Sequence, residues 1–342
     1  MEKIDLSAAA REGTLGSVPA DLLTIDVLTR PNASGNTPLH LAAKYGTIGQ
    51  LPAAVLGFEQ LTLKNDAGYT PVHLAARGGH LDRIPAAGLS REVFFVRSNS
   101  GYTPLHLAAS SGSLDQVPPG LLSAEVVLHK TDHGNTLLHE AAEAGTLDKF
   151  PAEFITQETL NTPNISGETV LHVAVFNGHL DQVPPAFLTV ENLLATTANH
   201  DTVLHAAAIS GHLGQIPETA LTHDNLVIPS KAGYTAIHAA AEAGFLSQIP
   251  RDRLTIDLLI TRNDFGDTPL HAAAVEGHLD QVPHEYFNRS TLFLRNYNGG
   301  TPIGAAIRHG HADQLPEDYR PRPPGPVRRL LIRIGLARPP FG

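Results

Sequence analysis

Residues 263–294 read NDFGDTPLHAAAVEGHLDQVPHEYFNRSTLFL, and this stretch belongs to a unit that returns every 33 residues along nearly the whole chain. A proline recurs at that interval: Pro19, Pro52, Pro85, Pro118, Pro151, Pro184, Pro217, Pro250, Pro283 and Pro316. A glycine lies six residues before each proline: Gly13, Gly46, Gly79, Gly112, Gly145, Gly178, Gly211, Gly244, Gly277 and Gly310. Two columns that stay in register over ten copies predict a solenoid of stacked units, because no single copy can bury its apolar face alone.

The first half of each unit has the pattern of a turn followed by a capped helix. In residues 65–70, NDAGYT, asparagine and glycine tolerate positive φ and favour a turn. Thr70 precedes Pro71, which is the usual order of an N-cap and the first helical residue. The apolar run that follows has helical spacing, and the column glycine is typical of a helix end. Each unit is therefore predicted to begin with a turn and one regular helix.

The second half of each unit has a proline where a helix would otherwise continue. A proline inside a helix loses a hydrogen bond and clashes with the preceding turn, which costs about 3 kcal/mol. The segment before it, HLDQV in residues 278–282, is predicted to form a short helical turn that stops or restarts at the proline. Five residues after nine of the prolines comes a residue of N-cap type: Thr24, Gly57, Ser90, Ser123, Thr156, Thr189, Thr222, Thr255 and Asn288. An apolar residue lies four positions after each of these, so the sequence predicts a short, capped final helix.

The copies differ at the two ends of the chain and at one internal turn. Residues 1–31 lack the first loop and have Ser7 in the histidine column, so they are predicted to form an N-terminal capping repeat. Eight full repeats then occupy residues 32–294, and residues 295–319, with Gly304 in the histidine column, are predicted to be the C-terminal capping repeat. His200 stands where the other full copies have glycine, which predicts a distorted turn or a left-handed conformation at this residue.

Residues 320–342 are a basic tail rich in proline and arginine. Three fates stay open for it: docking on the apolar end of the last repeat, disorder, or contact with an anionic membrane or nucleic acid.

Composition excludes several classes of function. The 342 residues contain no cysteine, which excludes disulfides, thiolate metal sites and cysteine nucleophiles. The net charge is −10, and because residues 320–342 hold six arginines and no acidic residue, residues 1–319 carry −16. An acidic body binds phosphate backbones poorly, so no specific nucleic acid is expected. No signal peptide and no run of about 18 apolar residues occurs, so we expect no transmembrane segment and a cytoplasmic monomer, with delivery into a host cell left open.

The pattern G-x-T-P-L-H-x-A-A-x-x-G-H resembles the ankyrin repeat. Clean copies occupy residues 35–46, 68–80, 101–112 and 266–278, and the resemblance covers roughly residues 4–318. It implies an all-α fold, an ankyrin-type α-solenoid of ten 33-residue repeats with short β-hairpin-like fingers. Members of the family mostly bind other proteins through the finger tips and the concave face of the first helices. The second half of the unit departs from the family pattern, because the proline and the second cap replace an unbroken E-[IV]-V-x-L-L-L run.

The chain has 19 histidines, but their spacing argues against chemistry. Eight form one column of the repeat: His40, His73, His106, His139, His172, His205, His238 and His271. The resemblance implies that this imidazole is a structural hydrogen-bonding group between neighbouring repeats. Metal sites need convergent ligands, and the sequence has no HExxH motif, P-loop or G-x-S-x-G motif. We therefore expect no catalytic residue, no metal site and no cofactor, and we predict that the protein is not an enzyme.

Binding residues are expected where the columns vary on the face that the resemblance makes concave. Four positions past the column histidine stand Lys44, Arg77, Ser110, Glu143, Phe176, Ile209, Glu242 and Val275. Phe176 and Ile209 are apolar where four other copies are charged, so they either form a partner-binding patch or pack on a neighbouring repeat. The finger tyrosines Tyr69, Tyr102 and Tyr234 either contact the partner, since tyrosine is enriched in interfaces, or pack on the next finger. We predict a partner held along these five residues, with Lys44 and Arg77 beside them.

The sequence as a whole predicts a non-catalytic module that binds a protein or peptide along the concave face and finger tips. Two alternatives stay open: an effector or inhibitor that docks on another cell's enzyme, and a module that sequesters a small ligand. The small-ligand module would have a closed pocket between repeats, lined by convergent polar groups.

Overall fold

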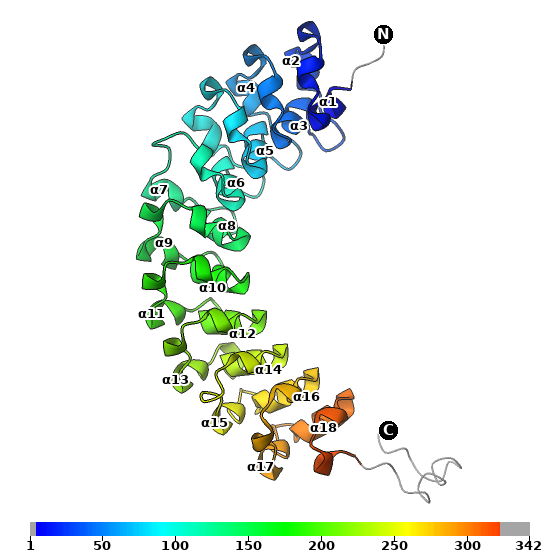
Figure 1. Ribbon diagram of the computed structural model, residues 1–342, viewed down its shortest axis with the longest axis vertical. Helices are drawn as coiled ribbons and strands as arrows, with labels where there is room; N and C mark the ends of the chain where they lie inside the picture. Colours follow the sequence, from blue (N-terminus) through cyan, green and yellow to red (C-terminus); the bar gives the residue numbers. More distant parts are fainter. Residues whose placement is uncertain (1–4, 322–342) are drawn as a thin grey trace, which may run out of the picture. The chain divides into compact units, whose positions relative to one another are not determined.

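The computed structural model describes residues 5–321, and in this range 18 α-helices alternate with 3-10 helices and turns without any strand. Two compact units divide the chain, Met1–Phe187 and Leu188–Gly342. Within each unit, longer helices alternate along the chain with short ones (Figure 1). Among the described residues, no helix combines the length and the apolar character that a membrane span requires. The predicted all-α class is confirmed.

The longer helices pack against one another in sequence order within each unit, and we call them the first helices. In the first unit they are α1 (Leu6–Glu12), α3 (Pro38–Lys44), α5 (Pro71–Gly78), α6 (Pro104–Ser111), α8 (Leu137–Ala144) and α10 (Val170–Phe176). In the second unit they are α12 (Val203–Ser210), α14 (Ala236–Ala243), α16 (Pro269–Glu276) and α18 (Pro302–His309). Paired alanines such as Ala42 and Ala43 are fully buried between them, and their small side chains let neighbouring helices approach closely.

A capping box begins each first helix from α3 to α16. In α3 the Thr37 Oγ1 accepts the His40 backbone N–H at 3.4 Å, and the Thr37 N–H donates to His40 Nδ1 at 3.2 Å. All eight helices have this box, including α8, α10, α12 and α14, which have no proline at their first position. The Thr-x-x-His pair therefore starts the helix whether or not proline follows the threonine.

Each column proline lies just after a single turn of 3-10 helix, and in eight copies a second turn follows it. The turns before the proline are η1 (Leu15–Ser17), η3 (Ile48–Gln50), η5 (Leu81–Arg83), η8 (Leu114–Gln116), η9 (Leu147–Lys149), η11 (Leu180–Gln182), η13 (Leu213–Gln215), η16 (Leu246–Gln248), η17 (Leu279–Gln281) and η19 (Ala312–Gln314). The turns after it are η2 (Ala20–Leu22), η4 (Ala53–Val55), η6 (Ala86–Gly88), η10 (Ala152–Phe154), η12 (Pro185–Phe187), η14 (Glu218–Ala220), η18 (His284–Tyr286) and η20 (Glu317–Tyr319). Pro85, at φ −54° and ψ 135°, has extended backbone that a continuous helix excludes. The predicted stop and restart at the proline is confirmed.

The short final helices are α2 (Ile25–Leu28), α4 (Phe58–Leu61), α7 (Ala124–Val127), α9 (Gln157–Asn161), α11 (Val190–Leu193), α13 (His223–Leu226), α15 (Ile256–Leu259) and α17 (Arg289–Leu292). The third copy has a 3-10 helix there instead, η7 (Arg91–Phe95). All nine predicted N-cap residues occupy the N-cap position. The apolar residue four positions later has 0% exposure in every copy: Leu28, Leu61, Phe94, Val127, Leu160, Leu193, Leu226, Leu259 and Leu292. The core of each unit therefore lies between the first helices and these short helices.

The fingers are tight turns, each closed by a backbone hydrogen bond, as from the Asn65 N–H to the Tyr69 carbonyl at 2.9 Å. Neighbouring fingers are linked as well, for example by the Asn99 N–H and the Ala67 carbonyl at 3.1 Å. They are hairpin-like in this sense, but within residues 5–321 the one isolated β-bridge joins Thr196 and Thr202.

The finger asparagines do not use positive φ, which corrects the expectation from sequence. In the described range the only non-glycine residues with positive φ are His200, at 63°, and Ala232, at 70°. The side chain of Asn65 instead accepts the backbone N–H groups of Ala67 and Tyr69 through Oδ1. Asparagine therefore shapes the turn by an Asx hydrogen bond, and the glycine supplies the left-handed residue. The left-handed His200 agrees with prediction, while Ala232 was not anticipated.

The capping repeats and their boundaries stay predictions. At one end the Asp5 carboxylate caps α1 by accepting the N–H groups of Ser7 and Ala8. At the other end the Thr301 Oγ1 accepts the Gly304 N–H at 3.1 Å, and glycine has no side chain to add. Residues 322–342, nearly the whole predicted tail, lie outside the described residues, so its three possible fates stay open.

In four copies a glutamine two residues before the column proline fastens the repeat to the one before it by a pair of hydrogen bonds. Gln182 Nε2 donates to the Gly145 carbonyl at 3.0 Å, and its Oε1 accepts the Leu147 N–H at 2.9 Å. Equivalent pairs of bonds are made by Gln116, Gln248 and Gln314. These side chains satisfy backbone groups at the C-terminal end of the preceding first helix.

We expect Gln182→Ala to lower the free energy of unfolding by about 1–3 kcal/mol, because it leaves the Gly145 carbonyl and the Leu147 N–H without a partner. Lys149→Ala is the matched control, since Lys149 is an exposed residue of the same column that makes no such pair of bonds. Urea denaturation followed by circular dichroism measures both. Equal midpoints for the two variants would show that the glutamine bonds contribute nothing.

Candidate functional site

The first helices present exposed residues four and five positions past the column histidine, which we call the first-helix face. Its exposed members are Lys44, Tyr45, Arg77, Gly78, Glu143, Ala144, Phe176 and Asn177 in the first unit, and Ile209, Glu242 and Glu276 in the second. The residues one position past the histidine are mostly buried: Leu41, Leu74, Leu107, Glu140 and Ala239 are at most 8% exposed. A partner that approaches the first helices would therefore contact the residues four and five positions past the histidine, and not those one position past it.

Phe176 and Ile209 are exposed apolar side chains at equivalent repeat positions. Phe176, the last residue of α10 in the first unit, is 55% exposed, and Ile209, in α12 of the second unit, is 56% exposed. Lys44 and Arg77 are also exposed, and the Lys44 Nζ lies 5.4 Å from the centroid of the Tyr45 ring. All four are accessible to a partner, and their role in binding stays a prediction.

The finger tyrosines are half-buried and pack on the histidine of their own repeat. The ring centroids of Tyr69 and His73 are 5.5 Å apart, and those of Tyr234 and His238 are 5.1 Å apart. Tyr102 packs on His106 in the same way, at 6.1 Å. These tyrosines therefore support the base of each finger and offer a partner only part of their side chain.

Six column histidines link their repeat to the finger of the next, and His106 bonds instead to the His129 carbonyl, just before the next finger. The backbone N–H of Thr37 can only donate, so Nδ1 of His40 accepts, and the proton is on Nε2, which donates to the Tyr69 carbonyl at 3.0 Å. The same bond runs from His73 to Tyr102, from His139 to Glu168 and from His238 to Asp267. The structural role that the family resemblance implied for this histidine agrees with these contacts.

Burial keeps these imidazoles neutral. It lowers the pKa of His73, His106, His139 and His238 to about 4, and it lowers those of His40, His205 and His271 in the same direction. A neutral ring with both nitrogens hydrogen-bonded is a poor base and has no lone pair free for a metal. Within residues 5–321, no group of three or more His, Asp or Glu side chains is arranged to hold a metal ion.

Glu140, one position past the column histidine in α8, is a buried carboxyl group. It is 5% exposed, and its Oε1 accepts the Asn135 Nδ2 at 3.1 Å. It also shares a hydrogen bond with the Tyr102 hydroxyl. Burial, aided by the charge of Glu143, raises the pKa of Glu140 to about 7, and burial together with the charge of Glu140 raises the pKa of Tyr102 to about 12. The Glu140 carboxyl group therefore fills the space next to Tyr102 of the preceding repeat.

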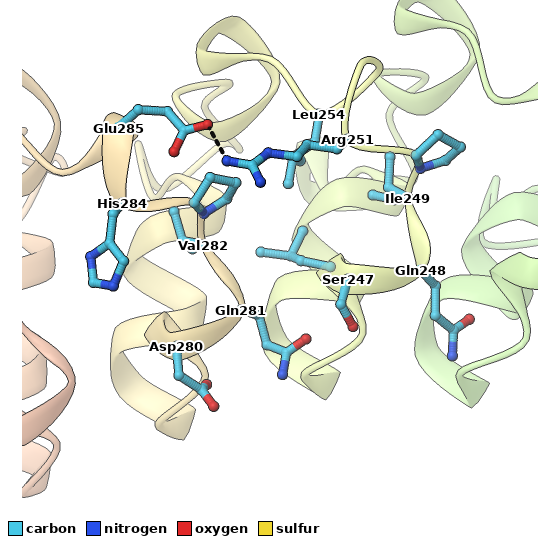
Figure 2. Close-up of a pocket in the computed structure, with 13 residues that line it drawn as sticks. Ser247, Gln248, Ile249, Arg251, Leu254, Asp280, Gln281, Val282, His284 and Glu285 are labelled. Atoms are coloured by element: carbon cyan, nitrogen blue, oxygen red, sulfur yellow. Dashed lines mark hydrogen bonds and ion pairs between the residues drawn. The ribbon is translucent and has the colours of Figure 1, made fainter.

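Each unit also has a groove between successive proline turns. Figure 2 shows one in the second unit, a cavity of about 520 Å³ across which Arg251 and Glu285 form an ion pair at 2.9 Å. A groove of about 600 Å³ lies between the Pro85 and Pro118 turns of the first unit. Both lie between proline turns, which recur in every copy, whereas the Arg251–Glu285 ion pair does not recur. An exposed ion pair of this kind stabilises a fold by about 0–1 kcal/mol. These grooves follow from the repeat itself and do not single out one site.

Comparison with known proteins agrees with this architecture. The sequence model of the ankyrin repeat matches residues 34–51 and 100–118, which contain the turn, the capping threonine and the first helix of two copies. No curated protein matches the chain. The two matched stretches and the array of capped helices support an ankyrin-repeat assignment for this chain.

Proposed function

We propose that this chain is a non-catalytic interaction module that binds a protein or peptide along the first-helix face and the finger tips. Ankyrin repeats generally mediate protein–protein interactions. The observation that carries the proposal is the exposure of Phe176 and Ile209. Each side chain is more than half exposed, whereas the other large apolar residues of the same helices are mostly buried. Burying such a side chain against a partner contributes about 1.5–3 kcal/mol.

The charges on the first-helix face of the first unit favour one orientation of the partner. Lys44 and Arg77 lie on the first-helix face of α3 and α5, whereas Glu143 lies on that of α8, later in the first unit. In the second unit, taken by itself, the same face is acidic at Glu242 and Glu276. A partner with the opposite order of charges to that of the first unit would associate with this unit faster and in one register. At the finger tips, Phe265 and Tyr297 are 59% and 71% exposed and add aromatic contact area.

The test compares two double variants in affinity capture from the native cell, followed by a binding titration with the captured protein. Phe176→Ala with Ile209→Ala is expected to weaken binding at least about tenfold, because two central apolar contacts are lost. Phe58→Ala with Phe293→Ala is the control, since these residues are exposed near the short helices α4 and α17. Unchanged affinity of every captured protein for the Phe176 and Ile209 variant would contradict the proposal.

A further inference from the structure

Between α14 and α16 the second unit has a cavity of about 260 Å³ on the side of the fingers and the first-helix face. Tyr234 lines it together with Ala272 and Val275, and three carboxylates also line it: Glu242, Asp267 and Glu276. Small-molecule sites typically measure roughly 300–1,000 Å³. The cavity therefore suits a single side chain better than a whole ligand.

The hydroxyl of Tyr234 lacks a hydrogen-bond partner, although its Oη is buried. Nearly all buried polar atoms in folded proteins have a partner, and an unpaired one is unfavourable. Tyr234 also lines the cavity, so a ligand bound there would lie against this residue.

The repeat itself contains the filled counterpart of this cavity. Ala272 stands four periods after Glu140, and Tyr234 stands four periods after Tyr102. At the earlier position the Glu140 carboxylate occupies the space and bonds with the Tyr102 hydroxyl. At the later position alanine leaves the space open and Tyr234 without its bond. The cavity is thus a specific departure from the repeat and not a feature of every copy.

The charges around the cavity select the sign of the ligand. Among the described residues, none of Glu242, Asp267 and Glu276 forms an ion pair. Burial raises the pKa of Glu242, and the charge of Glu276 adds to that rise, so these two carboxylates lack a compensating cation. Arg262 is a cation close to His271, which also lines the cavity, but its Nη1 donates to the Gly266 and Arg295 carbonyls and the three carboxylates outnumber its single charge. An anionic group would be repelled here, and a cation would be attracted.

We propose that this cavity binds one basic side chain, arginine or lysine, presented by a polypeptide segment. The aliphatic stem would lie against Ala272 and Val275, and the cationic head would meet Glu242 and Glu276. The side chain would lie against Tyr234, and a shift of the tyrosine ring would let its unpaired Oη accept a guanidinium or ammonium N–H. The inference rests on the proposed function, because it gives the chemistry of the segment that the module holds.

Two sources can present such a side chain. One is a partner protein with a basic segment. The other is this chain's own residues 322–342, which contain Arg322, Arg328, Arg329, Arg333 and Arg338 and no acidic residue. Both sources would place the same chemical group in the same cavity, so the test must distinguish them.

The direct test titrates the full chain, labelled at valine methyl groups, with N-acetyl-arginine amide while the Val275 resonance is followed by NMR. N-acetyl-citrulline amide, which has nearly the same shape and no charge, is the ligand control. We expect the arginine probe to shift Val275 in a saturable way at millimolar concentration and the citrulline probe to have little effect. Equal responses to both probes would overturn the inference, because charge would then play no part.

Two protein variants locate the binding energy. Glu242→Gln with Glu276→Gln should weaken binding of the arginine probe about tenfold, which corresponds to about 1.4 kcal/mol. The control variant, Glu191→Gln with Glu218→Gln, should bind the probe with unchanged affinity. All four residues are exposed, so the fold is retained in both. Tyr234→Phe should keep or slightly raise the melting temperature, since it removes a buried hydroxyl that has no partner, and should weaken binding of the probe about threefold. Unchanged probe affinity in the Glu242 and Glu276 variant would contradict the assignment.

Replacing the five tail arginines by glutamine in the full chain separates the sources. Tighter binding of the probe in that variant would mean that the chain's own segment occupies the cavity, and unchanged binding would point to a partner. The proposed function is tested separately from the cavity. A captured protein that is lost with Phe176 and Ile209 but retained by the Glu242 and Glu276 variant would support the module and refute the cavity.

Discussion

Between pH 7 and pH 5 the protein is expected to lose several kcal/mol of stability, because its column histidines are buried in the neutral form. Their pKa is about 6.5 in the unfolded chain and falls to about 4 for His73, His106, His139 and His238 in the folded protein. Below pH 6.5 the unfolded state therefore binds more protons, so stability is complete above that pH and decreases as the pH falls toward 4. At pH 5 each of these four groups accounts for a loss of roughly 2 kcal/mol.

One buried carboxyl opposes this trend. The pKa of Glu140 is raised from 4.5 to about 7, so its contribution increases as the pH falls over the same range, and it offsets roughly one histidine. The net loss is still a large part of the 5–15 kcal/mol typical of folded domains. Urea midpoints by circular dichroism at pH 7, 6 and 5 measure it. His139→Gln should make the dependence shallower and Glu140→Gln should make it steeper, and a midpoint that does not move between pH 7 and pH 5 would contradict the account.

Gly244→Ala is expected to destabilise the protein by about 2–4 kcal/mol, more than the same change at Gly79. Both glycines end a first helix in the left-handed region, at φ +79° and +68°, where a Cβ atom is unfavourable by about 1–2 kcal/mol. At Gly244 the new Cβ would also lie 2.6 Å from the His278 ring, whereas at Gly79 nothing lies within 4 Å. Forcing the ring aside adds roughly 1–3 kcal/mol.

A double-mutant cycle isolates the ring contact. His278→Ala in the background of Gly244→Ala should restore most of the difference between the two glycine variants and leave the conformational part in place. Chemical denaturation of the four proteins gives the coupling energy. No coupling between positions 244 and 278, or equal losses at Gly244 and Gly79, would show that the backbone conformation alone determines the effect.

The fold could be read from the sequence because each element leaves a mark in one column of a repeating unit. The Thr-x-x-His cap, the proline turn and the second cap each appear at a fixed position, and ten copies average out local exceptions. The fingers were harder to interpret, since asparagine stabilises a turn either by positive φ or by its side-chain oxygen. The left-handed Ala232 could not be foreseen, because alanine has no intrinsic preference for that conformation.

The candidate site was less accessible to sequence reasoning, because it depends on exposure and on gaps. Phe176 and Ile209 stood out as breaks in a column, and their exposure is consistent with that choice. The burial of Glu140 was missed, since a carboxylate in a variable column is usually solvated. The cavity beside Tyr234 was missed as well. Ala272 matches the family pattern, and no residue type in the sequence marks an empty space.

The bonds that most column histidines make to the following finger give each unit a direction. Every copy from α3 to α16 has a histidine ring in its capping box, whereas Gly304 in α18 has no side chain with which to donate. Each unit is therefore polar, because its repeats donate towards the C-terminal side and accept from the N-terminal side. The repeat of α18 accepts this bond from His271 at the Gly300 carbonyl and has no donor of this kind itself.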